Sequence, residues 1–186
     1  NVWMVTEKGR SFFDGSTFLE LPQAGMFYSS NCFDGDTTCW DIISFPFPYG
    51  YQFVKITPST FLTPTPMLSG SPTNTHTLCA DTNQTLWGTG YDGFWEFSNG
   101  VWKQDTAINI DPSRIRETRW NPKNGDLYLD CEIVPPQPIH QLRKYNNGNT
   151  TLIYSGGNNE VRMKCIDPDG NLWFTRDSML STPLLF

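Results

Sequence analysis

An apolar residue followed by tryptophan or tyrosine recurs along this chain of 186 residues, at intervals of 37, 47, 41 and 45 residues. A spacing of this size is typical of proteins built from repeated structural units, and it constrains the fold more than any local pattern does. A unit of about 42 residues is long enough for four short strands and their turns. The five recurring aromatic residues are Trp3, Trp40, Trp87, Tyr128 and Trp173.

Positions around these aromatic residues repeat as well. A cysteine lies eight residues before three of the tryptophans, at Cys32, Cys79 and Cys165. In the fourth unit, equal spacing places Trp120 at the cysteine position, whereas alignment of the following turn places Arg119 there. Two stretches align without a gap at an offset of 84 residues, matching Trp3, Gly9, Phe13 and Phe18 with Trp87, Gly93, Phe97 and Trp102.

Each unit is expected to form four strands, A to D, with strand A innermost. In the third unit we expect strand A at 75–79, strand B at 85–90, strand C at 94–97 and strand D at 101–104. Asn99-Gly100 favours a hairpin turn between C and D, and Asp167-Pro-Asp-Gly170 favours a tight turn between A and B. The segment 112–120 is expected to lead into a strand, with a one-turn helix as the alternative. Together these patterns predict an all-β chain.

The turn and strand sequences resemble those of known propeller families. Leu86-Trp-Gly-Thr89 with Asp92-Gly93, and the run from Asp167 to Thr175, resemble the repeat of two-component-regulator-type propellers, in which an Asp-x-x-Gly-x-Leu-Trp segment recurs in each blade. The run Asn171 to Thr175, with the Thr-Pro pairs between 56 and 66, is similar to streptogramin-lyase propellers. The segment from Asn121 to Tyr128 is similar to five-bladed lectins of the tachylectin type. A shared fold signature does not transfer function.

The resemblance implies a small β-propeller, in which four-stranded blades surround an axis. Five strand-B signatures make five blades the first choice, with a four-bladed ring or an open arc as alternatives. We expect one domain over residues 1–186, with units that begin near residues 2, 39, 86, 127 and 172. The first unit would lack its strand A, and the last would stop around strand C. A start within a repeat is expected for a mature chain, an excised piece or an incomplete copy.

Composition argues against several classes of partner. Charged residues make up 17% of the chain, and the net charge is −6 without a basic cluster, so nucleic-acid binding is not expected. No apolar run approaches membrane-spanning length, so membrane insertion is not expected either. Low charge with many Asn, Thr, Ser and aromatic residues favours an extracellular or periplasmic location.

Five cysteines are an odd number, so at least one thiol stays free or pairs outside the chain. Blade symmetry would hold the three repeated cysteines too far apart for disulfides, and we expect them to be buried small side chains. Cys32 and Cys39 flank a six-residue turn, at the positions where Cys165 and Leu172 would face each other. A Cys32–Cys39 disulfide under oxidising conditions is therefore a candidate.

Ligands of such propellers usually meet the face that carries the D–A and B–C loops. Two B–C loops, 44–51 and 131–140, are enlarged and rich in proline, and loops on a rigid scaffold often carry binding. Their aromatic rings could stack on a sugar or a partner side chain, or could instead fold down and plug the ring. The candidate ligand-binding residues are Phe45, Phe47, Tyr49, Tyr51, Asp92, Glu132, His140 and Asp177.

No catalytic, metal-binding or cofactor-binding motif stands out. His76 and His140 occupy different repeat positions, and a structural role is expected for each. The aspartates of the A–B turns supply at most two carboxylates per turn, and turn formation explains them better than calcium binding. A non-catalytic module that binds a glycan or another surface ligand is the first hypothesis. The alternatives are a structural or assembly segment that associates with other chains, and a hydrolase or lyase that uses acidic loop residues.

Overall fold

Eighteen β-strands and one 3₁₀ turn make up the described part of the chain, in a computed structural model. The structure describes residues 2–6, 9–22, 26–34, 38–45, 50–57, 60–62, 77–83, 85–134, 138–177 and 184–185. Every strand pair is antiparallel, which confirms the all-β prediction. Within these residues, no helix is long and apolar enough to cross a membrane.

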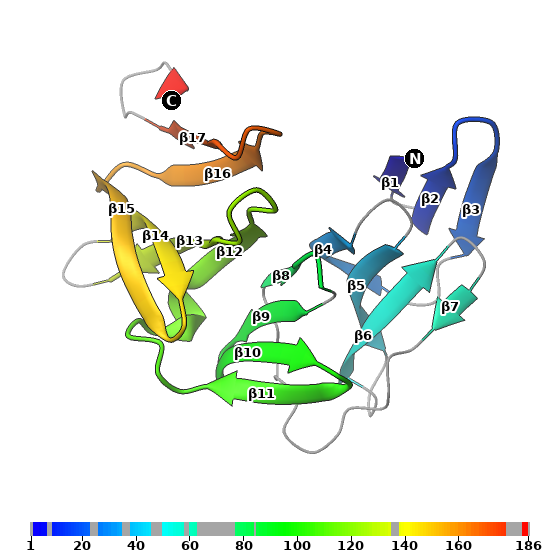
Figure 1. Ribbon diagram of the computed structural model, residues 1–186, viewed down its shortest axis with the longest axis horizontal. Helices are drawn as coiled ribbons and strands as arrows, with labels where there is room; N and C mark the ends of the chain where they lie inside the picture. The colour runs from blue at the N-terminus through cyan, green and yellow to red at the C-terminus, as the bar shows by residue number, and fades with distance from the viewer. Residues whose placement is uncertain are drawn as a thin grey trace.

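The strands form five sheets that follow one another along the chain (Figure 1). The first sheet contains β1 (Val2–Thr6), β2 (Gly9–Phe13) and β3 (Phe18–Pro22). The second contains β4 (Met26–Asp34), β5 (Thr38–Phe45), β6 (Gly50–Thr57) and β7 (Thr60–Leu62). The third contains β8 (Thr77–Ala80), β9 (Leu86–Gly90), β10 (Gly93–Ser98) and β11 (Val101–Asp105).

The fourth and fifth sheets complete the chain. The 3₁₀ turn η1 (Pro112–Arg114) leads into the fourth sheet, which contains β12 (Ile115–Trp120), β13 (Leu127–Ile133), β14 (Ile139–Asn146) and β15 (Asn149–Gly157). The fifth contains β16 (Val161–Ile166), β17 (Leu172–Arg176) and β18 (Leu184–Leu185). The segment 112–120 thus contains both predicted alternatives, a one-turn helix and a strand. Asp111 caps the short helical turn, and β12 begins directly after it.

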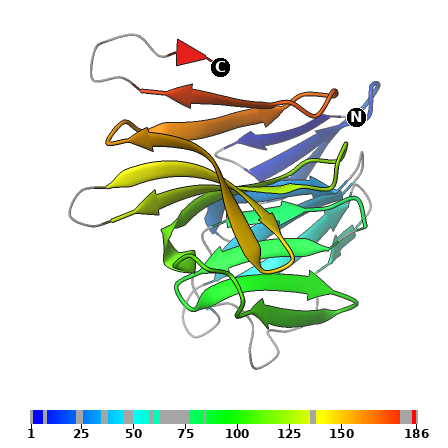
Figure 2. The ribbon, with the colours of Figure 1, turned by 60° about the vertical axis from the view of Figure 1, so that its left-hand side comes forward.

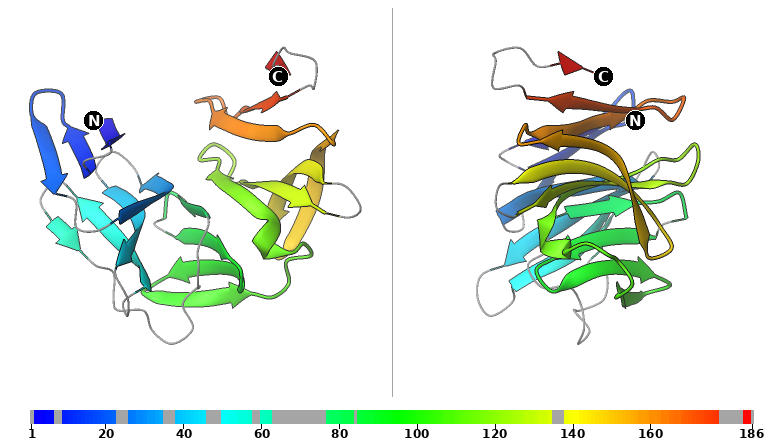
Figure 3. Two further views of the ribbon diagram at one scale, coloured as in Figure 1. Left: turned by 180° about the vertical axis from the view of Figure 1, so that it is seen from behind. Right: turned by 90° about the vertical axis from the view of Figure 1, so that its left-hand side faces the viewer.

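The sheets are arranged around an arc, with β4, β8, β12 and β16 on its inner side (Figure 1). The view from behind shows the same opening between the first and fifth sheets (Figure 3, left). The two turned views show the strands of successive sheets one above another (Figure 2; Figure 3, right). Neighbouring inner strands β4, β8 and β12 lie against one another. Thr118 of β12 donates a hydrogen bond to Thr77 of β8, at 3.2 Å between the hydroxyl oxygens. This arrangement is compatible with the predicted propeller.

Short hairpins set the register of the sheets. Asn99 and Gly100 both have positive φ, as a two-residue hairpin turn requires, and Ser98 pairs with Val101. The turn before β17 closes as predicted, with the Gly170 N–H donating to the carbonyl of Asp167. In the fourth sheet, Arg119 lies opposite Tyr128, so the alignment based on the turn is correct and the one based on equal spacing is wrong. The reason is that the turn of this unit is one residue longer.

The cysteine positions follow the same register. Cys32, Cys79 and Cys165 lie opposite Trp40, Trp87 and Trp173, so the prediction that Cys165 faces Leu172 is wrong by one residue. Cys32 therefore does not lie directly opposite Cys39, which pairs with Phe33, and the disulfide between them stays a prediction. Cys79 is buried, as expected, but Cys165 is exposed, because no sheet lies beyond the fifth within the described residues.

The core lies between the sheets, where the recurring aromatic residues pack. Trp40 meets Phe97 of the third sheet at 6.3 Å between ring centroids, and Trp87 meets Tyr145 of the fourth at 5.6 Å. Tyr128 packs with Val161 and Met163 of the fifth sheet. Each of these rings thus bridges to the following sheet, which fits the expected role in packing.

Candidate functional site

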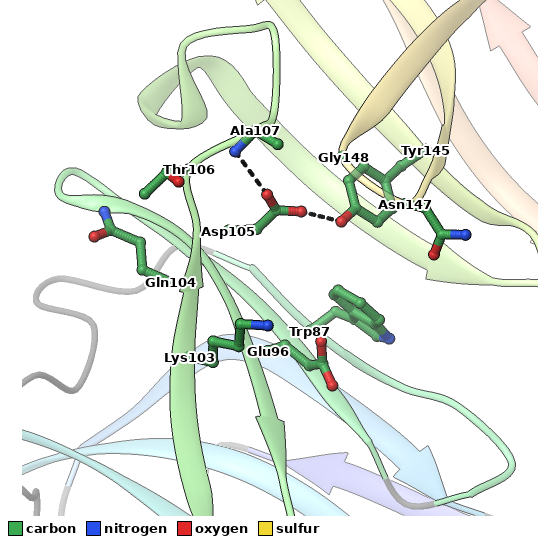
Figure 4. A pocket seen from close by; sticks show the side chains of 10 residues that line it. All are labelled: Trp87, Glu96, Lys103, Gln104, Asp105, Thr106, Ala107, Tyr145, Asn147 and Gly148. Carbon is green, nitrogen blue, oxygen red and sulfur yellow. Dashed lines mark hydrogen bonds between the residues drawn. The ribbon is translucent and has the colours of Figure 1, made fainter.

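Two regions concentrate polar side chains. The first is a cavity of about 350 Å³ between the outer strands of the third and fourth sheets, which we call the rim cavity (Figure 4). The second is an ion-pair network around Arg116, between the fourth and fifth sheets. The rim cavity is lined by Trp87, Glu96, Lys103, Gln104, Asp105, Thr106, Ala107, Tyr145, Asn147 and Gly148.

One wall of the rim cavity is a row of side chains across three strands. Glu96 of β10 lies opposite Trp87 of β9 on one side and opposite Lys103 of β11 on the other. Directly opposed residues of antiparallel strands share a face of the sheet, so the indole, the carboxylate and the ammonium group lie next to one another. Figure 4 shows these three side chains next to one another, below Asp105 and Tyr145.

The facing wall comes from the fourth sheet. The Tyr145 hydroxyl donates a hydrogen bond to Asp105, whose other carboxylate oxygen accepts from the Ala107 N–H at 2.8 Å (Figure 4). Burial, together with the hydrogen bond to Asp105, raises the pKa of the Tyr145 phenol well above its usual range. The phenol therefore stays a donor at neutral pH, and it holds the end of β11 against the fourth sheet.

The chemistry of the rim cavity suits a ligand that is polar at its edge and apolar on its face. The half-buried Trp87 supplies aromatic surface, while Lys103 supplies a donor and Glu96 an acceptor. Asn147, in the hairpin turn of the fourth sheet, can do both through its amide. Pockets that mix aromatic walls with a few placed polar groups are typical of small-molecule sites.

A smaller cavity of about 230 Å³ lies next to the rim cavity. It opens between the turn that joins β9 to β10 and the segment that leads to η1. Gln104, Asp105 and Thr106 line both cavities, so the end of β11 separates them. The remaining lining residues of this second cavity are Tyr91, Asp92, Gly93, Ile108 and Pro112.

The Arg116 network lies where the fourth sheet meets the start of β16. Arg116 donates to Asp130 and to Glu160, each at 3.0 Å, and to the carbonyl of Val161 at 2.7 Å. Glu132 lies 4.0 Å from the same guanidinium group. One side chain of β12 thus joins β13 to the beginning of β16.

The charges of this network largely satisfy one another. Burial raises the pKa of Asp130, whose side chain is 3% exposed, although Arg116 opposes the shift. Hydrogen bonds from Arg162 and then from Arg116 outweigh a small burial effect and lower the pKa of Glu160. Because the guanidinium group is engaged by the chain itself, we assign this network to holding the two sheets together. Among the described residues, no group of three or more His, Cys, Asp and Glu side chains could hold a metal ion.

The structure brings three of the predicted ligand residues together. Glu132 lies directly opposite His140 on β13 and β14, and the Asp177 N–H donates to the carbonyl of Glu160 at 2.9 Å. All three border the Arg116 network. The His140 side chain is 8% exposed, and its Nδ1 has no hydrogen-bond partner among the described residues. Asp92 lies elsewhere, in the second cavity.

The predicted aromatic loop falls largely outside the described residues. Phe47 and Tyr49 lie outside them, and Phe45 and Tyr51 are described through their backbone, with Phe45 opposite Gly50 and Tyr51 opposite Ser44. Whether these residues bind a ligand stays a prediction. Sequence reasoning missed the polar residues of the rim cavity, because Glu96, Lys103 and Asp105 repeat nowhere else in the chain. The alternation of side chains along β10 and β11 was the available signal.

No protein-family model and no curated protein matches this chain.

Proposed function

We propose that this chain is a propeller-type recognition module of five blades in an open arc, and that it binds a carbohydrate without catalysing a reaction. The fold part of the proposal is supported by five sheets in succession, with strands β4, β8, β12 and β16 innermost. The resemblance to two-component-regulator-type and lectin propellers also supports it. An extracellular or periplasmic location belongs to the same proposal.

The observation that carries the carbohydrate proposal is the mixed lining of the rim cavity. A sugar ring has an apolar face of C–H groups, which packs on aromatic side chains such as the half-buried Trp87. Its hydroxyl groups both donate and accept, so they need partners of both kinds. Lys103 donates, Glu96 accepts, and Asn147 does both. A purely apolar ligand would remove water from the charges of Glu96 and Lys103 without replacing its hydrogen bonds.

Isothermal titration with a panel of monosaccharides and short oligosaccharides tests this proposal. We expect binding to at least one sugar, weakened at least tenfold by Glu96→Gln combined with Lys103→Met. Lys123→Met is the matched control, since Lys123 is exposed in the turn before β13 and lines neither cavity. Failure of every sugar to bind the folded protein would remove the proposal.

A second candidate is assembly with other copies of the chain, and the exposed end of the arc favours it. Trp173 occupies the same repeat position as Trp40, Trp87 and Tyr128 but is 37% exposed. The first sheet of another copy has three strands, β1 to β3, with Trp3 on β1, so it corresponds to the outer three strands of a four-stranded sheet. Sedimentation equilibrium over a hundredfold range of concentration tests this candidate: self-association that Trp173→Ser abolishes supports it, and a monomer throughout rejects it.

A further inference from the structure

The second cavity and the rim cavity share one wall, and this arrangement bears on the size of the ligand. Gln104, Asp105 and Thr106 line both. These residues end β11, the outermost strand of the third sheet. In Figure 4, Gln104 extends to the opposite side of the β11 ribbon from Lys103 and Asp105. A ligand that fills both cavities therefore has to cross the end of this edge strand.

The wall is held in place from both sides. The Gln104 side-chain amide donates to the carbonyl of Asp92 at 2.6 Å, which ties β11 to the turn between β9 and β10. Asp105 accepts from Tyr145 of the fourth sheet. A Cβ at Gly93 would lie 2.3 Å from the Gln104 amide nitrogen, so a side chain there would displace the Gln104 amide from this position. A preformed wall loses little conformational entropy when a ligand binds.

The second cavity offers an aromatic ring of its own. Tyr91 is 67% exposed, beside Asp92 in the turn that forms one side of this cavity. A tyrosine in such a place presents an apolar face and a hydroxyl at a small cost in side-chain entropy, which suits the recognition of polar rings. Ile108 and Pro112 form the other side. Each cavity thus combines aromatic surface with polar groups, as a series of sugar subsites requires.

The charge of the two cavities restricts the class of sugar. Glu96, Asp92 and Asp105 carry negative charge, and Lys103 is the one cationic side chain among the lining residues. A carboxylated or sulfated sugar would meet net repulsion, which disfavours it relative to an uncharged one. The uneven charge therefore points to neutral sugars.

We infer that the rim cavity and the second cavity are consecutive subsites for an uncharged oligosaccharide of at least two sugar rings, which crosses the end of β11. This inference rests on the proposed carbohydrate-binding function. Two linked rings bind more tightly than one because the second ring binds within the same molecule. The affinity should therefore rise with chain length until both cavities are filled.

Isothermal titration with glucose, mannose and N-acetylglucosamine, and with their linear oligomers of two to four residues, provides the test. We expect at least a tenfold gain in affinity from one ring to three for the sugar that binds. Tyr91→Ala should abolish most of that gain, whereas Glu96→Gln with Lys103→Met should weaken the binding of both monosaccharides and oligomers. Phe18→Ala is the matched control, since Phe18 is 60% exposed in the first sheet.

The outcomes separate the inference from the proposed function. Equal affinity for one and three rings, or a Tyr91→Ala variant that binds like the parent, overturns the inference and leaves a one-ring site. Tighter binding of sialylated or sulfated trisaccharides than of neutral ones overturns the assigned class. Absence of binding to every sugar overturns the proposed function, and the inference with it.

Discussion

The third and fifth sheets contain the same repeat, but their equivalent residues meet different surroundings. Cys79 and Cys165 lie opposite Trp87 and Trp173 in the same register. In the third sheet, which has neighbours on both sides, the cysteine is buried and the tryptophan half-buried. In the fifth sheet, which packs on the fourth, both are exposed. The repeat therefore determines the position of a residue within its sheet, and the neighbouring sheet determines its burial.

The turns of the two sheets show how much of the structure is local. Asp81 accepts from the Thr85 N–H at 2.9 Å, and Asp167 accepts from the Asn171 N–H at 2.8 Å, four residues on in each case. The backbone of each aspartate also donates to the carbonyl of that residue. The same turn therefore forms in the third sheet, which has neighbouring sheets on both sides, and in the fifth, which packs on the fourth. It forms in both because its hydrogen bonds lie within the turn.

The largest expected difference between the two sheets is in thiol reactivity. Burial raises the pKa of Cys79 from 9.0 to about 12, which leaves about a thousandfold less thiolate at neutral pH. Alkylation of Cys165 in the native protein should be faster by at least that factor, because its thiol is exposed. Mass spectrometry after timed labelling measures both rates. In urea the two thiols should react at equal rates, which is the control. Equal rates in the native protein would contradict the burial of Cys79.

Truncation of the two equivalent tryptophans should also separate the sheets. Trp87→Ala removes contacts with Phe94 and Tyr145 and should lower the free energy of unfolding by about 3 kcal/mol. Trp173→Ala should cost less than about 1 kcal/mol, because surface substitutions have small effects. Urea titration followed by circular dichroism gives both values. Similar losses for the two variants would show that a neighbour covers Trp173 in solution.

The junction of the fourth and fifth sheets can be tested through two arginines that share Glu160. Arg116→Met leaves Asp130 buried without its partner and should cost about 2 kcal/mol, a value reduced for the partial exposure of the guanidinium group. Arg162→Met removes an exposed pair with the same glutamate and should cost less than about 0.5 kcal/mol. Urea titration again gives the comparison, and an equal cost for both would mean that Arg116 does not join the sheets.

The smallest effect should be a pH dependence confined to the turn of the fifth sheet. Hydrogen bonds from Asn171 and Trp173 lower the pKa of Asp167 from 3.8 to about 2. Because the folded-state pKa is lowered, the stabilisation by this carboxylate is present above pH 3.8 and disappears as the pH falls through 2. A carboxyl-carbon NMR titration should show the midpoint near 2. Asn171→Ala should raise the midpoint toward 3.8, and an unchanged midpoint would disprove the assigned cause.

The sequence was sufficient for the strands and for much of their register. The period of the aromatic residues located the second strand of each full unit, because these rings have to pack at equivalent places between sheets. Turn sequences such as Asn99-Gly100 located the hairpins, since few residues other than Gly and Asn accept positive φ. In the fourth sheet, the length of the turn gave the register that equal spacing missed.

The candidate sites were harder to predict, for a physical reason. The rim cavity and the Arg116 network both form between sheets, from residues that do not repeat. Arg116 and Glu160 are 44 residues apart, and no local pattern pairs them. Prediction from loops named Asp92, Glu132, His140 and Asp177 as candidates, but it did not connect any of them with Arg116.

The attachment of the fifth sheet has a dynamic consequence. It contacts the fourth sheet through the cluster around Val161 and Met163, through Arg116, and through the Asn121 amide, which donates to the Gly170 carbonyl at 2.8 Å. Among the described strands, the fifth sheet has a neighbouring sheet on one side, and a unit held on one side opens at a lower free energy than one held on two. The hairpin of β16 and β17 should thus detach as a cooperative unit, and its amide protons should exchange with solvent while those of β9 and β13 remain protected.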